Sequence, residues 1–365
     1  MKIEILKDHF SKALSVAAGA SNKNLSLPVL GCVVIAASNN KAAIQATNLD
    51  VSIETTLKAK IITEGVVAVP AQTLTQTINT LIDKKLILSV EGNSLIIDGE
   101  RSTTSITTID PAEFPTLPYV KKTNTSVTLP ANDLATTLRS VAFAASISSI
   151  KPELSSVALS LEEGELTAAA TDSFRLAEVK IPVKVKNGFP TTLIPARNIP
   201  DILRAIDGAG DIEIRVGDNQ CSFIAEFGYL TSRTIDGAFP DYRAIIPKES
   251  VASATCLTED AVRAFRKAAI FADAFNQVHL SFKRAEKAFT VRALNASVGE
   301  AVDHIPSAID GEDSDINFNA RYVSDALAVI SSDSVSFSVA GPGKPMLITD
   351  IPRKGFTYLV MPMNR

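Results

Sequence analysis

The chain repeats itself at an interval of 123 to 125 residues, and this repeat restricts the fold more than any other feature of the sequence. The segment Ala46-Thr47-Asn48 follows a turn and an apolar strand pattern. The same order recurs at Ala170-Thr171-Asp172 and again at Ala293-Leu294-Asn295. A chain of 365 residues has room for three copies of such a unit.

Further pairs of segments recur with nearly the same offset and in the same order. Val69-Pro70-Ala71 returns as Ile194-Pro195-Ala196, and Phe114-Pro115 returns as Phe239-Pro240. One coincidence would mean little, but several in register predict three tandem units.

Each unit has the same order of predicted helices and strands. An amphipathic helix opens it, as in the second unit, where Leu134, Leu138, Val141 and Ala145 share one helical face. A second helix follows the Pro-Ala signal, and short strands with turns fill the rest. Helices are expected over residues 6–18, 71–82, 131–146, 196–206, 258–273 and 319–330. The predicted fold is α+β, with two helices and two small sheets per unit.

The polar stretches 119–127 and 248–256 lack hydrophobic periodicity, and we interpret them as linkers between the units. The expected domains are therefore residues 1–122, 123–250 and 251–365.

Residues that carry enzyme chemistry are sparse. His9, His279 and His304 stand far apart with no partner at metal-ligand spacing, so neither a metal site nor a cofactor is expected. The segment 341–345 partly matches the motif of a phosphate-binding loop, but Pro345 stands where that motif needs Ser or Thr. The 40 carboxylates form no recognisable pair. No motif in the sequence indicates a catalytic activity. An enzyme built on the same scaffold stays open as an alternative.

The sequence also indicates the cellular compartment. The residues after Met1 lack the apolar run of a secretory signal, and no stretch approaches the roughly 18 apolar residues of a membrane span. Three well-separated cysteines give no disulfide framework and suit a reducing compartment. A cytoplasmic protein without a membrane partner is expected.

The landmarks of the repeat, taken together, resemble those of a known family, the bacterial β sliding clamp, which is the processivity subunit of the replicative DNA polymerase. The resemblance runs from residue 1 to residue 365. It rests on Leu27-Pro28-Val29-Leu30, Ala46-Thr47-Asn48-Leu49-Asp50, Val69-Pro70-Ala71, Phe114-Pro115-Thr116-Leu117-Pro118, Ala170-Thr171-Asp172-Ser173-Phe174-Arg175-Leu176-Ala177, Phe239-Pro240-Asp241-Tyr242-Arg243 and Val360-Met361-Pro362-Met363.

This resemblance implies a head-to-tail homodimeric ring with three clamp domains per chain. Helices would line a central hole that encloses duplex DNA, and sheets would form the outer rim. Such a ring would tether the polymerase and other replication and repair proteins without chemistry of its own. A ring held on DNA by topology needs no strongly basic surface, which fits the formal net charge of −4.

The six expected helices carry nine basic and seven acidic residues, so the sign of their charge suits a DNA-facing lining. Scattered solvated charges are the alternative interpretation. Together with loop residues, the expected DNA-facing set is Lys12, Lys23, Arg139, Lys151, Arg197, Arg204, Arg263, Arg266 and Lys267.

The resemblance also implies a hydrophobic pocket that accepts short linear peptides from the polymerase, the clamp loader and repair proteins. Leu, Ile, Val and Met walls suit apolar anchors, and Met adapts to several partners. The alternative is that these residues belong to the core and that Arg175 holds a loop by an ion pair. The expected pocket is Leu154, Thr171, Phe174, Arg175, Leu176, Pro240, Ile245, Pro345, Met346, Leu359, Val360, Met361, Pro362 and Met363.

For the dimer seam, the resemblance points to the strand around residues 103–108 of one subunit against the third unit of the other. The expected seam residues are Thr104, Ile106, Ile270 and Phe271. The alternative interpretation places Ile270 and Phe271 in the internal core.

Several positions depart from the family pattern, including Ser173 in place of Gly, Thr104 in place of an aromatic residue, and Asn24 in place of Arg. Because of Thr104 and Asn24, a third hypothesis stays open beside the sliding clamp and the enzyme built on the same scaffold. It is a diverged relative that binds peptides but does not close around DNA.

Overall fold

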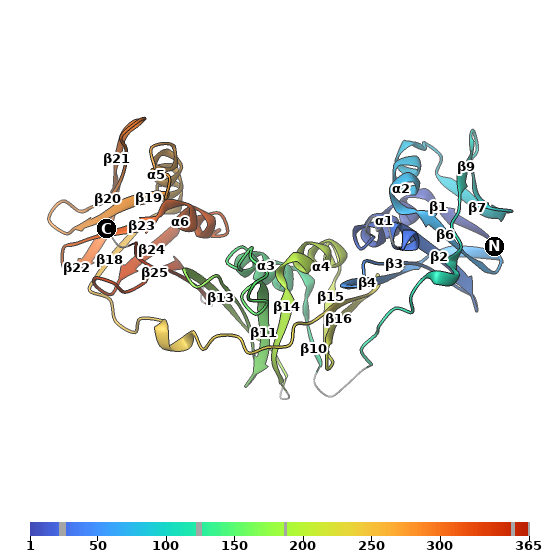
Figure 1. Ribbon diagram of the computed structural model, residues 1–365, viewed down its shortest axis with the longest axis horizontal. Coiled ribbons are helices and arrows are strands. Elements are labelled where there is room, and N and C mark those ends of the chain that lie inside the picture. Colours follow the sequence, from blue (N-terminus) through green and yellow to red (C-terminus); the bar gives the residue numbers. More distant parts are fainter. Residues whose placement is uncertain (22–26, 122–125, 186–187, 352–354, 364–365) are drawn as a thin grey trace. The chain divides into compact units, whose positions relative to one another are not determined.

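The computed structural model describes residues 1–21, 27–121, 126–185, 188–351 and 355–363. Its helices stand in the predicted places (Figure 1), which confirms the α+β fold. The described α-helices are α1 (Lys7–Gly19), α2 (Ala71–Thr80), α3 (Ala131–Ala142), α4 (Ile199–Ile206), α5 (Thr258–Ile270) and α6 (Ala320–Leu327). The fourth helix begins later than expected because a 3₁₀ turn, Ala196–Asn198, precedes it, and Pro200 lies in its first turn, where no N–H is needed.

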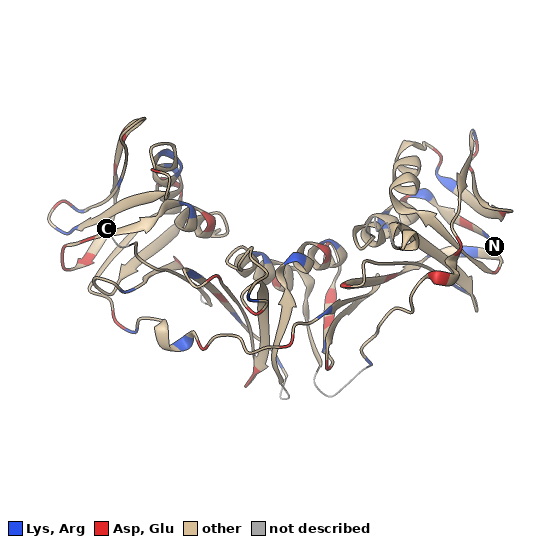
Figure 2. Ribbon diagram, in the orientation of Figure 1, with Lys and Arg blue, Asp and Glu red and all other residues tan. Residues whose placement is uncertain are grey.

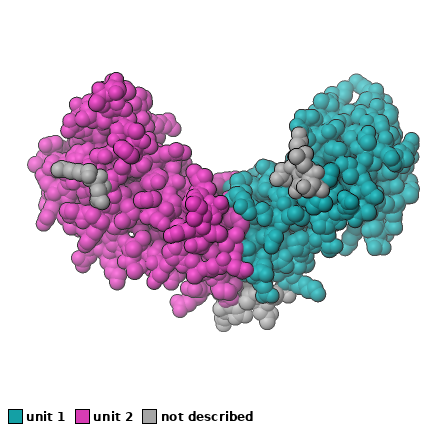
Figure 3. All heavy atoms as spheres, viewed as in Figure 1, with its two compact units in different colours: residues 1–135, 197–234 teal, residues 136–196, 235–365 magenta. Residues whose placement is uncertain are grey.

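The chain divides into two compact units, which Figure 3 colours separately. The first unit holds Met1–Ala135 and Arg197–Thr234, and the second holds Thr136–Ala196 and Ile235–Arg365. Each unit is built from two antiparallel sheets and the helices that pack on them.

The first unit contains a five-stranded and an eight-stranded sheet. The five-stranded order is β5 (Ala59–Thr63), β1 (Lys2–Leu6), β7 (Lys85–Glu91), β8 (Ser94–Asp98) and β9 (Thr103–Thr107). The eight-stranded order is β10 (Ser126–Pro130), β15 (Asp211–Val216), β16 (Gln220–Ala225), β17 (Gly228–Arg233), β4 (Val51–Leu57), β3 (Lys41–Thr47), β2 (Cys32–Ser38) and β6 (Gly65–Pro70). Helix α1 packs on this sheet because Phe10, Leu14 and Ala17 form one buried helical face.

The second unit contains a nine-stranded and a four-stranded sheet. The nine-stranded order is β14 (Phe189–Pro195), β11 (Ser156–Glu162), β12 (Glu165–Thr171), β13 (Arg175–Pro182), β26 (Phe356–Val360), β25 (Met346–Ile351), β24 (Ser334–Val339), β18 (Ala252–Leu257) and β22 (Ala308–Gly311). The four-stranded order is β21 (Gly299–Pro306), β20 (Ala288–Asn295), β19 (Gln277–Lys283) and β23 (Ser314–Asn319). Buried Phe265, Phe282, Phe289 and Phe337 join the two sheets with α5.

Both large sheets join strands from consecutive repeats. In the first unit β4 pairs with β17, with Ile53 opposite Leu230. In the second unit β13 pairs with β26, with Leu176 opposite Leu359. The middle repeat therefore contributes strands to both compact units. Main-chain hydrogen bonds therefore join each repeat to the next within one sheet. A repeat isolated at the expected domain boundaries would lose a neighbouring strand from that sheet.

The expected linkers need one correction. The stretch 248–256 is not a linker throughout, because β18 begins at Ala252 and pairs with both β24 and β22. Its side chains alternate between buried Ala252, Ala254 and Cys256 and more exposed neighbours. The buried Ala and the exposed Ser differ little in hydrophobicity, so the period-two pattern is weak. The hydrophobic pattern alone therefore did not predict this strand.

None of the helices in the described parts of the chain combines the length and the apolar composition that crossing a membrane requires.

Candidate functional site

The nine-stranded sheet brings together motif residues that lie far apart in the sequence. At one end of β13, Arg175 stands opposite Val360 and Leu176 stands opposite Leu359. On the next strand, Met346 stands opposite Val360. The predicted Thr-Asp-Ser-Phe-Arg-Leu motif and the carboxyl-terminal motif are therefore neighbours at one end of two central strands, β13 and β26.

Strand alternation divides these residues between the two faces of the sheet. Directly paired residues share a face, so Leu176 and Leu359 lie on one face, while Arg175, Val360 and Met346 lie on the other. Met346 and Val360 are fully buried, and Leu176 and Leu359 on the opposite face are buried as well.

A tight turn at residues 171–175 shapes the approach to β13. The Thr171 hydroxyl donates to the Arg175 carbonyl at 2.6 Å, and the Asp172 carboxylate accepts the N–H groups of Phe174 and Arg175 at 2.9 and 3.0 Å. Ser173 has a φ of 79°, in the left-handed region that favours glycine. The turn presents Phe174 with 62% of its surface exposed.

The first repeat builds the same turn with different residues. The Thr47 hydroxyl donates to the Val51 carbonyl at 2.9 Å, and the Asn48 side chain accepts the N–H groups of Asp50 and Val51. Leu49 has a φ of 75°, like Ser173 at the corresponding position. Shared turn geometry at an offset of 124 residues supports the repeat read from the sequence.

Arg175 is held from three directions and is only 8% exposed. Its Nε lies 2.9 Å from the Asp172 carboxylate, and its Nη1 lies 2.6 Å from the Asp325 carboxylate. Its guanidinium also stacks over the ring of Tyr322, 4.5 Å from the centroid. In this conformation Arg175 fixes the turn to α6, as the alternative interpretation of this residue describes.

The carboxyl-terminal tail continues from the end of β26 past the turn at 171–175. The Met361 N–H donates to the Phe174 carbonyl at 2.8 Å, and the Met363 N–H donates to the Asn317 carbonyl at 2.8 Å. Met361 is 36% exposed, and Pro362 and Met363 are half-buried. The tail is thus pinned by its main chain while its thioether side chains stay partly open to solvent.

The segment 239–245 contacts the same sheet at β13. The Tyr242 hydroxyl donates to the Glu178 carboxylate at 2.6 Å, and Glu178 lies on the same face of β13 as Leu176. Burial, together with Glu178, raises the pKa of Tyr242. Behind the segment lies a small pocket of about 190 Å³, lined by residues 239–243 and strands β11, β12 and β14.

The predicted pocket residues therefore fall into two groups by exposure. The exposed or half-buried group is Phe174, Pro240, Ile245, Met361, Pro362 and Met363. The buried group is Leu154, Thr171, Arg175, Leu176, Pro345, Met346, Leu359 and Val360. The exposed group is apolar throughout.

The predicted seam residues also lie in contrasting places. Strand β9 pairs only with β8 among the described strands, and β21 pairs only with β20. Ile106 is 6% exposed and belongs to the core of its unit, whereas Ile270 is 67% exposed at the end of α5. Phe271 is half-buried, with Gly299 at the start of β21 beside its ring.

An apolar patch surrounds this free edge of β21. Besides Ile270, its exposed members are Leu294, Val298 and Val302, each 41% to 58% exposed. Thr104 on β9 is half-buried. Both edges offer unpaired main-chain groups among the described residues, which is the feature that lets sheets of separate chains join.

The predicted DNA-facing residues are exposed wherever the structure describes them, and the blue ribbon in Figure 2 marks basic residues on the helices of each unit. Lys23 lies outside the described residues. Ion pairs engage Arg197 with Asp50, Arg204 with Asp201, Arg263 with Asp260, and Lys267 with Asp303. Within the described ranges, Lys12, Arg139, Lys151 and Arg266 have no such carboxylate partner.

Three consecutive domains of one family match the chain in order. The DNA polymerase III beta subunit N-terminal domain matches residues 1–118, its central domain matches residues 128–241, and its C-terminal domain matches residues 243–364. The chain belongs to the DNA polymerase III beta subunit family. Curated relatives named beta sliding clamp include one from Caulobacter vibrioides, 29% identical, and one from Bacillus subtilis, 26% identical, each match covering both chains fully.

Solved beta subunits share the fold along the whole chain. The beta subunit from Thermotoga maritima matches with a TM-score of 0.94 at 22% identity, covering 100% of this chain and 99% of that one. The sliding clamp from Bacillus subtilis matches with a TM-score of 0.93 at 25% identity and the same coverage. A sliding clamp from Pseudomonas aeruginosa, solved bound to griselimycin, matches with a TM-score of 0.93 at 23% identity and full coverage of both chains.

Sequence reasoning missed several residues that build the site of this beta subunit. Tyr322 and Asp325 on α6 hold Arg175, and the buried Tyr358 donates its hydroxyl to the Tyr322 carbonyl at 2.8 Å. Phe143 completes the aromatic surround, with its ring centroid 5.7 Å from the guanidinium. Only the one-turn spacing of Tyr322 and Asp325 on a predicted helix could have suggested a shared role.

Proposed function

We propose that this chain is a DNA sliding clamp, which encircles duplex DNA as a ring and tethers the replicative polymerase in the cytoplasm without catalysing a reaction. The observation that carries this proposal is the ordered match of three beta-subunit domains from residue 1 to residue 364. Within that framework we propose clamp domains at residues 1–122, 123–250 and 251–365.

The ring would close through two of the edge strands, β9 and β21. Strand β9 of one subunit would add to β21 of the other, extending a five-stranded sheet by a four-stranded one. The exposed Ile270 supports this arrangement, since an isoleucine with 67% of its surface in water gains from being covered. Because each subunit has one edge of each kind, two subunits joined head to tail would leave neither edge open.

The DNA would be held by enclosure, with weak help from charge. Four of the eight described basic candidates are already paired with carboxylates, which reduces their attraction for phosphate. Lys12, Arg139, Lys151 and Arg266 are the stronger candidates for contact with the backbone. Few and weak phosphate contacts suit sliding, because each firm contact would have to break at every step.

The exposed apolar residues beside the turn at 171–175 would receive short peptides from the polymerase, the clamp loader and repair proteins. Phe174, Ile245 and Met361 supply open apolar surface, and Leu176 and Leu359 are buried opposite each other on the adjoining strands. The buried Arg175 network keeps this surface in one conformation, which lowers the entropy lost on binding.

Deletion of residues 361–365 tests the peptide site. The deletion removes Met361, whose N–H anchors the tail to Phe174, so peptide binding should fall below detection while the dimer persists. Fluorescence anisotropy of a labelled peptide from the replicative polymerase measures the binding. The substitution Ile62→Ala, at an exposed isoleucine on β5 of the other unit, is the matched control and should keep full affinity. An unchanged affinity after the deletion would remove the site from this surface.

A further inference from the structure

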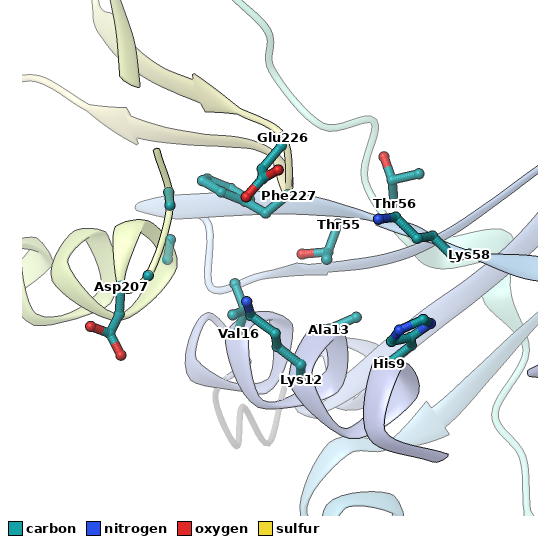
Figure 4. Close-up of a pocket in the computed structure, with 13 residues that line it drawn as sticks. His9, Lys12, Ala13, Val16, Thr55, Thr56, Lys58, Asp207, Glu226 and Phe227 are labelled. Atoms are coloured by element: carbon teal, nitrogen blue, oxygen red, sulfur yellow. The ribbon is translucent and has the colours of Figure 1, made fainter. Parts of the chain in front are cut away.

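A second pocket lies entirely within the first unit, apart from the peptide site. It has a volume of about 350 Å³, within the range of small-molecule sites. Helix α1 forms one wall, the turn between β16 and β17 forms the opposite wall, and the turn after α4 closes one end. Figure 4 shows Glu226 and Phe227 facing Lys12 and Val16 across this space.

The floor of the pocket is apolar and firmly positioned. Ala13 and Ala205 are buried, and Val16 and Phe227 are half-buried around them. The Phe227 carbonyl accepts the Thr56 N–H at 2.8 Å, which ties the β16–β17 turn to β4. Such a surface favours an aliphatic or aromatic group, which it can bind without rearranging.

A buried hydroxyl at the centre of this floor has no partner. Thr55 is 3% exposed, and its Oγ1 makes no hydrogen bond within the described part of the chain. Figure 4 places the Thr55 side chain between Phe227 and the side chains of α1. Because this oxygen is closed off from the pocket, a ligand meets only the rest of the Thr55 side chain, which adds to the apolar floor.

Charges of both signs surround the pocket. Lys58 and His9 lie at one end and Asp207 at the other, with Lys12 and Glu226 along the sides (Figure 4). Among the described residues, none of these five side chains forms an ion pair. Two lysines and two carboxylates suit a ligand that carries one positive and one negative group.

We propose that this pocket binds a small zwitterion with an apolar body, the chemistry of a free apolar amino acid. The apolar side chain would rest on Phe227 and Val16, the carboxylate would face Lys58, and the ammonium would face Glu226. The proposal does not depend on ring closure or on peptide binding, because every residue involved belongs to the first unit.

The probe for this proposal is 4-fluorophenylalanine, titrated into the full chain and followed by its ¹⁹F NMR signal. Its N-acetyl derivative lacks the ammonium, and its amide lacks the carboxylate. The zwitterion should bind about tenfold more tightly than either derivative, since each lost pair removes a charged contact. Equal binding of the N-acetyl derivative would overturn the proposal in favour of a simple anion site. No binding by any of the three would also overturn it, because the pocket would then hold only water.

Variants locate the binding in this pocket. Lys58→Gln removes the cation that faces the ligand carboxylate, so it should weaken binding about fivefold without lowering the thermal midpoint, because Lys58 is exposed. Ala209→Phe should fill the pocket and abolish binding, because Ala209 lines it and is only half-buried. Lys60→Gln, at an exposed lysine on β5 outside the pocket, is the control and should bind as the unsubstituted chain does. Full affinity in both Lys58→Gln and Ala209→Phe would show that the probe binds elsewhere.

Discussion

Arg175 shows how much of one side chain's role is set by residues distant in the sequence. Its neighbour Asp172 belongs to the repeated motif, but Asp325 is 150 residues away and Tyr322 lies on the same distant helix. With 8% exposure, the guanidinium cannot serve mainly as an exposed contact for a peptide. Its main effect is to fix the turn that presents Phe174.

Replacing this arginine should therefore lower stability sharply. Arg175→Leu leaves the Asp172 carboxylate, whose side chain is 14% exposed, without its partner. A loss of about 3 kcal/mol in the free energy of unfolding is expected, as for other broken buried ion pairs. Urea unfolding followed by circular dichroism measures the loss.

The matched control is Arg243→Leu in the same unit. Arg243 lies 3.6 Å from Glu162, and both side chains are 59% exposed, so this change should alter stability by less than about 1 kcal/mol. Equal losses in the two variants would contradict the structural role of Arg175.

At the residue scale, the repeated motif predicted that two segments correspond but not how they fold. Thr and Asx side chains bond their own backbone in both copies and form the same turn. The motif did not show which distant residues would lie beside Leu176 and Arg175, since that depends on pairing with Leu359 and Val360. Long-range register is not encoded in either motif alone.

Among the elements, the strands that matter most are two of those that end a sheet. Strand β9 ends the five-stranded sheet, and β21 ends the four-stranded sheet. The helices were predictable from period 3.6, and their starts and ends shifted by only a few residues. The strand β18 was hidden because its small residues carry too little hydrophobic contrast.

A charge beside the edge of β21 tests the proposed seam. Ile270→Asp places a carboxylate on the exposed apolar patch, so the dimer dissociation constant should rise at least tenfold. The fold should persist, because a substitution at a side chain with 67% exposure changes stability by about 0.5 kcal/mol or less. Sedimentation velocity across a dilution series measures the dissociation constant.

Ile147→Asp is the control for this test. Ile147 is 95% exposed in the second unit, after α3 and outside β9, β21 and α5, and its replacement should leave the dimer intact. If the unsubstituted chain sediments as a monomer at every concentration, a peptide-binding relative that does not form a ring would be the better description.

On the scale of the whole molecule, three repeats in the sequence become two compact units in the structure. The middle repeat contributes β10 and β15–β17 to one unit and β11–β14 to the other. The repeat offset predicted the number of copies. It could not predict this division, because strand pairing between copies follows the edges that each copy leaves open.

The net charge of −4 bears on how the whole molecule would bind DNA. Several helix acids pair with basic residues on the same helix, as Asp201 does with Arg204 and Asp260 does with Arg263. Pairing of this kind weakens attraction to phosphate without creating repulsion. A protein with so little attraction to DNA can remain on it for long only if the DNA passes through a closed ring.

Retention on circular DNA tests that claim most directly. Labelled protein is loaded onto a nicked circular plasmid by the clamp loader of the same organism, and the complex is isolated by gel filtration. One restriction enzyme then linearises the plasmid, with blocked ends in a parallel sample. The protein should stay on the circle and on the blocked linear DNA, and it should leave the linear DNA with free ends. Retention on linear DNA with free ends would contradict enclosure and show that contact energy alone holds the protein.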